Sequence, residues 1–498
     1  MTDSGAAVAF GVATADTYTG AVRDGPGSGL VGHESIPRRQ SARESAARTY
    51  ARALPVVPVR ARGLTIEGAD GHRYLDCLSG GGTLVLGHNH PVVLEAIRKV
   101  LDSGAPLHAH DLATPAQDAF TAELFRTLPP ELARRARVRF CGPAETNAVE
   151  AAFELVRAAT GRGGLLAFTG ASHGAMAGAA FDTLGGARDA WSVPLPYPQD
   201  YRCPFGLGGT RGAELAARWT ESALGDPESR TPLPAGMILE PVQDEGGVIT
   251  APDEWMRRMR QITAARSVPL IADEIQTGVG RTGAFWAVEH SGVTPDVLIL
   301  AKAIGGSLPL AVMVYRDDLD VVEPGARTHT FRGNQLAMAA GTATLAYVRE
   351  HRLAERAATL GSHMLTQLRE LDRDFAVIGE VRGRGLMIGV EMVDVAGAVE
   401  QSELDRVAAT GGGAWLESAT DPARGPRPAA PALASAVQRE CLRRGLIVGL
   451  GGRHGNVVRL LPPLTISDEQ ATAVLDRLAD AVEAVARGHA LGHKQRQG

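Results

Sequence analysis

Apolar positions in the middle of the chain fall into short runs, and the stretches between these runs have the spacing of helices. A short apolar run bounded by turn residues is typical of a buried strand, whereas apolar residues three and four apart predict a helix. Their alternation from about 115 to 345 indicates a mostly parallel sheet with helices on both faces. The predicted strands are 137–142, 164–170, 236–242, 268–275, 296–302 and 310–315, and the clearest helix is 148–160.

The segments on either side of this region predict a smaller α/β part. Residues 53–82 alternate apolar and polar positions around a turn at 69–71, which predicts a β-meander, and Pro91 opens a predicted helix. Ser467 can cap the last helix through its hydroxyl group. The other elements predicted near the C-terminus are helices 352–373 and 431–444 and strands 386–392, 446–450 and 456–462.

Composition along the chain indicates where domains begin and end. The start of the chain has few apolar clusters and predicts a flexible leader over 1–40, and the polar end predicts a disordered tail over 486–498. Residues 394–429 are rich in Ala, Gly, Pro and Ser, so they predict a mobile loop insertion. We expect a small domain built from 41–110 and 346–485, and a large domain over 111–345.

The chain has 498 residues, of which 44% are hydrophobic and 21% charged, and its formal net charge is −5. This composition is typical of a globular protein and lacks the basic excess of a protein that binds nucleic acid. No apolar run approaches the roughly 20 residues of a membrane span, and the N-terminus lacks the features of a signal peptide. The four cysteines form no CxxC pair, so we expect reduced thiols, no metal site and a cytoplasmic location.

Two charged residues stand at the ends of neighbouring predicted strands, Asp273 in the first and Lys302 in the second. Ligands of open α/β sheets bind at the carboxyl ends of strands, so we expect both side chains at one crevice. Such a pair suits a pyridoxal cofactor, because a carboxylate keeps the ring nitrogen protonated and a lysine amine can bind the aldehyde. A structural salt bridge between the two residues is the alternative.

The segments around these two residues carry a family resemblance. DEIQTGVGRTG (273–283), LILAKAIGG (298–306) and EPVQDEGG (240–247) resemble the motifs of class III (ω-amino acid) aminotransferases of fold-type I. The resemblance extends from about 50 to 485, and the motifs stand in the same order as in the family. Within the family, HTFRGNQLAMAAG (329–341) and RGRGLMIGVEM (382–392) are most similar to the diaminobutyrate–2-oxoglutarate aminotransferase branch.

This resemblance implies an α/β enzyme that binds pyridoxal 5'-phosphate, acts on amino acids and keto acids, and forms a homodimer. Lys302 would hold the cofactor as a Schiff base, and Asp273 would pair with the pyridine nitrogen. Glu245 and Arg459 would form a pair that opens when a substrate carboxylate needs the arginine. The other implied cofactor contacts are Ile275 on a ring face, Gln276 at the ring hydroxyl, and Thr330 at the phosphate from the neighbouring subunit.

The expected phosphate loop, 141–152, departs from the family pattern. Ala144, Glu145 and Thr146 stand where backbone N–H groups and a helix start would hold the phosphate. Glu145 replaces a glycine, and its carboxylate would oppose the phosphate dianion. Two further departures are Ser172, which replaces an aromatic residue that stacks on the ring, and Asp244, which replaces a glycine.

These departures leave three hypotheses open. The first is transamination between a diamino acid, such as 2,4-diaminobutyrate, and 2-oxoglutarate. The second is another pyridoxal-dependent reaction, such as decarboxylation, racemisation, elimination or an aminomutase step. The third is a non-catalytic relative. A dinucleotide site is not predicted, because no GxGxxG follows the first strand, and His88 with His90 alone is a weak metal signal.

Overall fold

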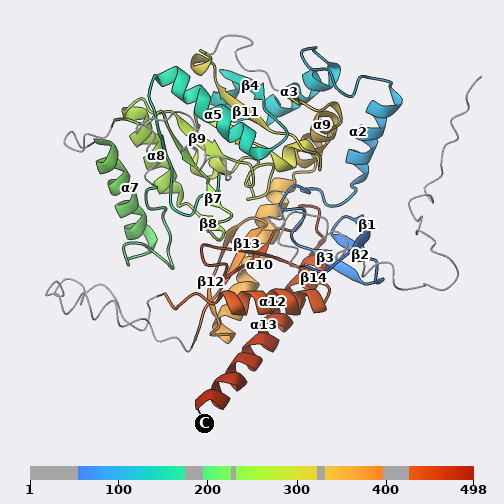
Figure 1. The fold of residues 1–498 in the computed structure, drawn as a ribbon, viewed down its shortest axis with the longest axis vertical. Helices are drawn as coiled ribbons and strands as arrows, with labels where there is room; N and C mark the ends of the chain where they lie inside the picture. The colour runs from blue at the N-terminus through green and yellow to red at the C-terminus, as the bar shows by residue number, and fades with distance from the viewer. Residues whose placement is uncertain (1–53, 174–193, 226–231, 322–330, 396–425, 498) are drawn as a thin grey trace, which may run out of the picture. The chain divides into compact units, whose positions relative to one another are not determined.

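The computed structural model describes residues 54–173, 194–225, 232–321, 331–395 and 426–497 (Figure 1). The predicted leader, most of the predicted 394–429 insertion, and Thr330 therefore lie outside the described residues. The chain divides into a small unit, 1–59 with 68–72, and a large unit, 60–67 with 73–498. In the small unit the described residues include a turn in which Ala69 N–H donates to Val57 O. The described helices belong to the large unit, and none of them is long and apolar enough to cross a membrane.

A six-stranded sheet forms the centre of the large unit, with the order β4-β11-β10-β9-β6-β5. Neighbours from β5 to β10 pair in parallel, whereas β11 runs antiparallel to both β10 and β4. The predicted mostly parallel sheet is confirmed. Its strands are β4 (Ala136–Phe140), β5 (Leu165–Leu166), β6 (Gly236–Leu239), β9 (Leu270–Asp273), β10 (Val297–Leu300) and β11 (Val312–Arg316).

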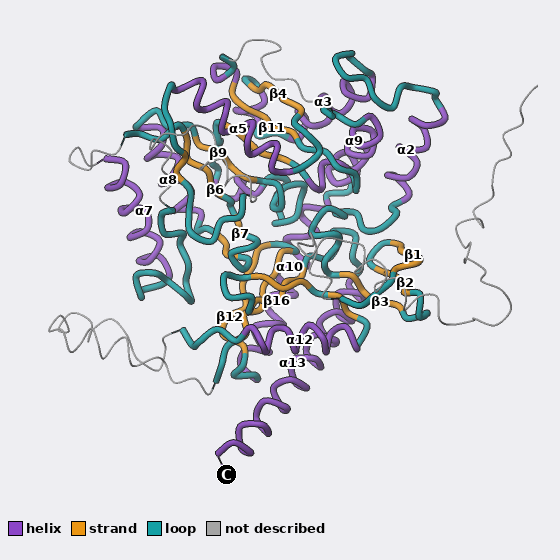
Figure 2. The backbone as a smooth tube through the Cα atoms, viewed as in Figure 1, coloured by secondary structure: helices purple, strands orange, loops and turns teal. Residues whose placement is uncertain are grey.

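Alternate residues of these strands enter two separate hydrophobic clusters, because side chains of a strand point to opposite faces. Ile271 and Ile299 share one cluster with α5 (Glu145–Thr160), which lies over the strands in Figure 1. Ala272 and Leu298 enter the other cluster, together with residues of α8 (Asp253–Ala265) and α9 (Gln335–Glu350). Figure 2 shows the strands between these helices, as the sequence predicted. The remaining helices of this part are α2 (Pro91–Asp102), α3 (Pro115–Thr127), α4 (Pro130–Ala133) and α7 (Gly209–Gly225).

Segments from both ends of the chain form the other sheets. Strand β14 (Leu446–Ile447) pairs in parallel with β3 (Arg73–Asp76), in the sheet order β1-β2-β3-β14. A second sheet has the order β12-β13-β16-β15, and a short hairpin joins β7 to β8. The remaining bounds are β1 (Pro58–Arg62), β2 (Thr65–Gly68), β7 (Val242–Gln243), β8 (Ile249–Thr250), β12 (Ile378–Arg384), β13 (Met387–Met392), β15 (Gly449–Gly451), β16 (Val457–Leu460), α10 (Leu353–Asp374), α12 (Pro431–Arg443) and α13 (Asp468–Gln497).

The last helix corrects one expectation and confirms another. Ser467 Oγ accepts from Gln470 N–H at 3.2 Å, so this serine caps the helix as predicted. The prediction of a disordered tail over 486–498 is wrong up to Gln497, because α13 continues to that residue. Its last turns contain Ala, Leu, Lys, Gln and Arg, which are all strong helix formers.

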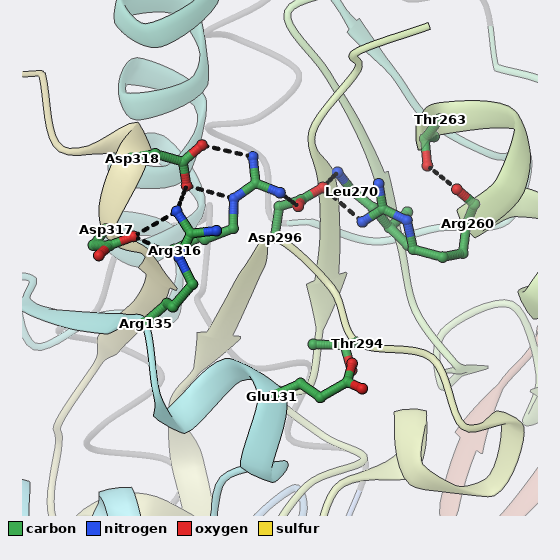
Figure 3. A network of polar contacts seen from close by, with 10 residues as sticks. All are labelled: Glu131, Arg135, Arg260, Thr263, Leu270, Thr294, Asp296, Arg316, Asp317 and Asp318. Atoms are coloured by element: carbon green, nitrogen blue, oxygen red, sulfur yellow. Dashed lines mark hydrogen bonds and ion pairs between the residues drawn. The ribbon is translucent and has the colours of Figure 1, made fainter. Parts of the chain in front are cut away.

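The buried residue Asp296 fixes the start of β10 against its neighbours (Figure 3). Its carboxylate accepts from Leu270 N–H at 2.8 Å, Arg260 Nη1 at 2.7 Å and Arg316 Nη1 at 2.6 Å. Its own N–H donates to Leu270 O at 2.9 Å. Asp296 therefore ties β10 to the first residue of β9 and the last residue of β11, which sets the register of all three strands.

Candidate active site

Asp273 and Lys302 lie at the carboxyl ends of adjacent strands, as the sequence predicted. Asp273 is the last residue of β9 and pairs with Ile299 of β10 in the parallel register. Two residues after β10, Lys302 begins a 3-10 turn and has a φ of 51°, a left-handed conformation that costs energy outside glycine. The structure does not form the alternative salt bridge between the two: among the described residues Asp273 is paired with His173, and Lys302 with Gln276 and Glu145.

A cavity of about 170 Å³ opens at these strand ends. Ala144 and Thr146 are the sequence neighbours of the lining residue Glu145, and Arg459 forms ion pairs with the lining residues Asp244 and Glu245. Thr330 lies outside the described residues. The structure therefore brings most of the predicted site together. The predicted residues that line the cavity are Glu145, Ser172, Glu245, Asp273, Ile275, Gln276 and Lys302.

The lysine amine has a polar partner and an acidic neighbour. Lys302 Nζ donates to Gln276 Oε1 at 2.6 Å and lies 3.8 Å from Glu145 Oε2. The Nε2 of Gln276 is buried without a hydrogen-bond partner among the described residues. Gly82 lies against this amide with φ 87°, and a Cβ there would come within 2.5 Å of Nε2. The glycine therefore leaves room for Gln276 to point into the site.

His173 is a site residue to which sequence reasoning gave no role. Its Nδ1 lies 2.8 Å from Asp273 Oδ2, while Asp273 Oδ1 accepts from Ile275 N–H at 3.1 Å. Burial lowers the pKa of His173, but the hydrogen bond to Asp273 and the charge of that carboxylate outweigh the effect of burial and leave the pKa raised. The histidine of ASHG was visible in the sequence, but its contact spans 100 residues.

Glu240 is a second site residue that sequence reasoning did not single out. Its carboxyl group is buried and accepts from Ser172 N–H at 3.1 Å and from Asp244 N–H at 3.3 Å. Burial raises the pKa of Glu240 to about 8, with His173 acting against the rise and Asp273 adding to it. Glu240 therefore carries a proton over much of the neutral range, and it joins the ASHG segment to the β7-β8 hairpin.

The predicted pair of Glu245 and Arg459 is formed in the structure. Arg459 Nη1 lies 2.8 Å from Glu245 Oε1, and Nη2 donates to Leu450 O at 2.8 Å. Asp244 shares the same nitrogen, with Oδ2 at 2.9 Å from Nη1. The residue that departs from the family pattern is therefore part of the arginine site.

The segment predicted to be a phosphate loop leads directly into a helix, as predicted, but the helix starts earlier than residue 148. Helix α5 begins at Glu145, and Ala144 N–H donates to Asn147 Oδ1 at 3.2 Å. A helix N-terminus attracts anions through its free N–H groups and its dipole. The Glu145 carboxylate already occupies this region beside Lys302, so it competes with any anion bound there.

Comparison with known proteins identifies the family. The profile of class III aminotransferases matches residues 46–482. The chain belongs to this family. A diaminobutyrate–2-oxoglutarate aminotransferase of Rhizobium meliloti is 48% identical over 457 residues, which cover 90% of this chain and 92% of the relative. One of Haemophilus influenzae is 40% identical over 460 residues, which cover 91% and 96%.

Solved structures support the same assignment for this class III aminotransferase. An amine transaminase from an uncultivated Pseudomonas species, solved in the PLP-bound form, matches with a TM-score of 0.74 and 29% identity. The match covers 89% of this chain and 97% of that chain. The aminotransferase has the fold-type I architecture, and its cofactor is pyridoxal phosphate. The cavity fits this cofactor, since it offers a lysine amine, a buried carboxylate and the amide nitrogen of Gln276, which has no partner in the part of the chain that the structure describes.

The raised pKa of Glu240 gives a prediction for stability against pH. Between about 4.5, its ordinary pKa, and about 8, the folded protein keeps a proton that the unfolded chain has lost. The free energy of unfolding therefore falls as pH rises through this window. The Glu240→Gln variant has no titrating group at this position. We therefore expect its free energy of unfolding, minus that of the wild type, to increase by up to about 1.4 kcal/mol for each unit by which pH rises.

Urea unfolding of the cofactor-free protein at several pH values between 5 and 8.5 measures this effect. Glu370→Gln, on the exposed side of α10, is the matched control for removal of one carboxyl group. The prediction is contradicted if Glu240→Gln loses stability with rising pH as steeply as the wild type does, or if Glu370→Gln removes the fall as Glu240→Gln does.

Proposed function

We propose that this aminotransferase moves the terminal amino group of a diamino acid, such as 2,4-diaminobutyrate, to 2-oxoglutarate and forms glutamate. The observation that carries the proposal is the arginine site beside the Lys302 cavity, where Arg459 is held by an acidic group that can leave. The same site must accept the terminal amino group of the diamino acid, which has no carboxylate beside it, and the dicarboxylic acid 2-oxoglutarate. The relatives at 48% and 40% identity are named for this pair of substrates, which supports the choice.

The cofactor would lie between the lysine and the aspartate. Pyridoxal phosphate supplies an aldehyde that takes up the amino group and a ring that withdraws electrons from the substrate carbon. Lys302 would hold the aldehyde and then accept a proton from the substrate carbon and return it through Nζ. Asp273 would keep the ring nitrogen protonated, and His173 holds Asp273 in place through Nδ1. The further contacts we propose are Ile275 at a ring face, Gln276 at the ring hydroxyl, Ser172 near the ring, and Ala144, Glu145 and Thr146 at the phosphate.

Glu245 and Arg459 would admit the two substrates in turn. The Glu245 side chain is 55% exposed, whereas that of Arg459 is 10% exposed, so the glutamate is the partner that can move. With Glu245 in place, the arginine is neutralised and the amine end of the donor can enter. With Glu245 turned away, the guanidinium can bind a carboxylate of 2-oxoglutarate through two parallel hydrogen bonds.

Replacement of Lys302 tests the proposed function. The wild-type holoenzyme should produce glutamate from 2,4-diaminobutyrate and 2-oxoglutarate, and Lys302→Ala should lower kcat on the order of a thousandfold, since proton transfer is lost. Glutamate formation measured by chromatography gives the rate, and cofactor absorbance gives occupancy. Turnover of the donor without a keto acid would point instead to another pyridoxal-dependent reaction, and absence of glutamate in the wild type would reject the proposal.

Replacement of Glu145 tests its competition with the cofactor phosphate. Glu145→Gln removes a negative charge near Lys302 Nζ while keeping the side chain's size. We expect the dissociation constant for pyridoxal phosphate to fall roughly tenfold, and to fall less at high salt. Absorbance titration of the cofactor-free protein measures it, with Glu150→Gln in the same helix as the control. Equal or weaker binding by Glu145→Gln would show that the carboxylate does not oppose the phosphate.

We also propose a homodimer in which Thr330 reaches the cofactor phosphate of the neighbouring subunit. Exposed apolar residues around Phe331, the next residue along the chain, support an interface here. Phe331 is 69% exposed and its ring lies 5.6 Å from that of His108, while Leu112 is 70% exposed.

A location in the cytoplasm is proposed as well, supported by the free state of all four cysteines, and cell fractionation tests it.

Mixed dimers test the shared site. Lys302→Ala and Thr330→Ala are each expected to bind the cofactor weakly, but co-expressed chains form heterodimers. In these, one site combines Lys302 of one chain with Thr330 of the other, so one wild-type site per heterodimer should regain cofactor affinity and activity. Separately tagged chains, purified through both tags, allow the measurement. If no site recovers, Thr330 acts within its own chain or not at the cofactor.

A further inference from the structure

Asp244 stands on a rigid turn between β7 and β8. Its N–H donates to Glu240 Oε2 at 3.3 Å, and its carbonyl oxygen accepts from Gly247 N–H at 2.9 Å and Val248 N–H at 3.2 Å. The backbone is therefore bonded on both sides of this residue. A short aspartate side chain on such a backbone has little freedom to move.

Two carboxylates share one nitrogen of Arg459, but their surroundings differ. Asp244 Oδ2 and Glu245 Oε1 lie 2.9 Å and 2.8 Å from Nη1. The side chain of Asp244 is 11% exposed and that of Glu245 is 55% exposed. Glu245 can turn into solvent by rotating a longer side chain, whereas Asp244 stays beside the guanidinium when Glu245 leaves.

The arginine itself is also held in place. Nη2 donates to Leu450 O at 2.8 Å, and a Cβ at Gly451 would come within 2.7 Å of Arg459 Nε. The backbone of β15 therefore packs directly against the guanidinium. Arg459 cannot move away from Asp244 without breaking this contact, so the pair persists in both states of Glu245.

The second oxygen of Asp244 points to a ligand. Oδ1 is buried and has no hydrogen-bond partner among the described residues, and Asp244 lines the cavity that contains Lys302. A buried carboxylate oxygen without a donor is costly, so a donor that arrives with the substrate is favoured. The ammonium group of a diamino acid is such a donor, whereas a dicarboxylic acid offers none.

We infer that Asp244 is a permanent counter-ion of Arg459 that biases the site toward cationic amino donors and against dicarboxylates. This inference rests on the proposed function, in which Arg459 receives a carboxylate of 2-oxoglutarate. That carboxylate meets a guanidinium whose charge Asp244 already balances, so it binds less tightly than to a free arginine. The same aspartate attracts the ammonium group of the donor.

Binding of glutarate to the holoenzyme tests the inference without turnover. Glutarate has the two carboxylates of 2-oxoglutarate but no keto group, so it binds without accepting an amino group. We expect Asp244→Asn to tighten glutarate about tenfold by calorimetry, since one negative charge beside Arg459 is removed. The KM for 2-oxoglutarate should fall by a similar factor, and the KM for the diamino donor should rise several-fold, with kcat little changed. Asp480→Asn, on the exposed side of α13, removes the same charge far from Arg459 in sequence and should leave glutarate binding unchanged.

The sign of the effect separates this role from a structural one. If Asp244 only holds Arg459 in position, both Asp244→Asn and Asp244→Gly will weaken glutarate, and the inference is overturned. Unchanged glutarate binding in both variants, with circular dichroism like that of the wild type, overturns it too. A wild-type holoenzyme that makes no glutamate from 2,4-diaminobutyrate rejects the proposed function instead, since glutarate binding does not depend on the donor.

Discussion

The parallel pairing of β9 with β10 is the constraint on which the candidate site depends. Asp273 and Lys302 meet at one cavity only if Ile299 lies opposite Asp273, because a shift of one residue would turn Lys302 to the other face. Asp296 holds that register from the opposite end of the strands, through both backbone groups of Leu270 and through two arginines. The ion pairs of Asp296 where the strands begin thus position Asp273 and Lys302 where the strands end.

Negative charge in the cavity is the second constraint. Burial keeps Glu240 protonated over much of the neutral range, and Asp273 is balanced by His173. Asp244 is paired with Arg459, although burial raises the pKa of its carboxyl group against the effect of Arg459 and Lys302. The site therefore contains acidic groups at short distances because each one is protonated, paired or partly exposed. The carboxyl groups concerned are Glu145, Glu240, Asp244, Glu245 and Asp273.

Much of this arrangement could be predicted from the sequence, and the exceptions have physical reasons. Asp273 and Lys302 could be predicted as site residues from their positions at strand ends, because buried parallel strands are apolar runs whose ends are clear in the sequence. His173 and Glu240 were missed as site residues, since their roles come from contacts 100 and 68 residues away. Strand β12 was missed because its RGR end is polar, and those arginines bind acidic groups that sequence proximity does not show.

The contacts of Asp296 that fix the strand register lie at the opposite ends of the strands from the cavity that contains Lys302. This separation has a consequence for how such an enzyme changes during evolution. Asp296 and the two arginines that bind it lie where the strands begin, so they are not altered when loops at the other edge exchange residues. Glu145, Ser172 and Asp244 all belong to that other edge, on segments that follow strands β4, β5 and β7. Substitutions there can change substrate specificity one at a time while the strands keep their register. The fold can therefore acquire new specificities without loss of its geometry.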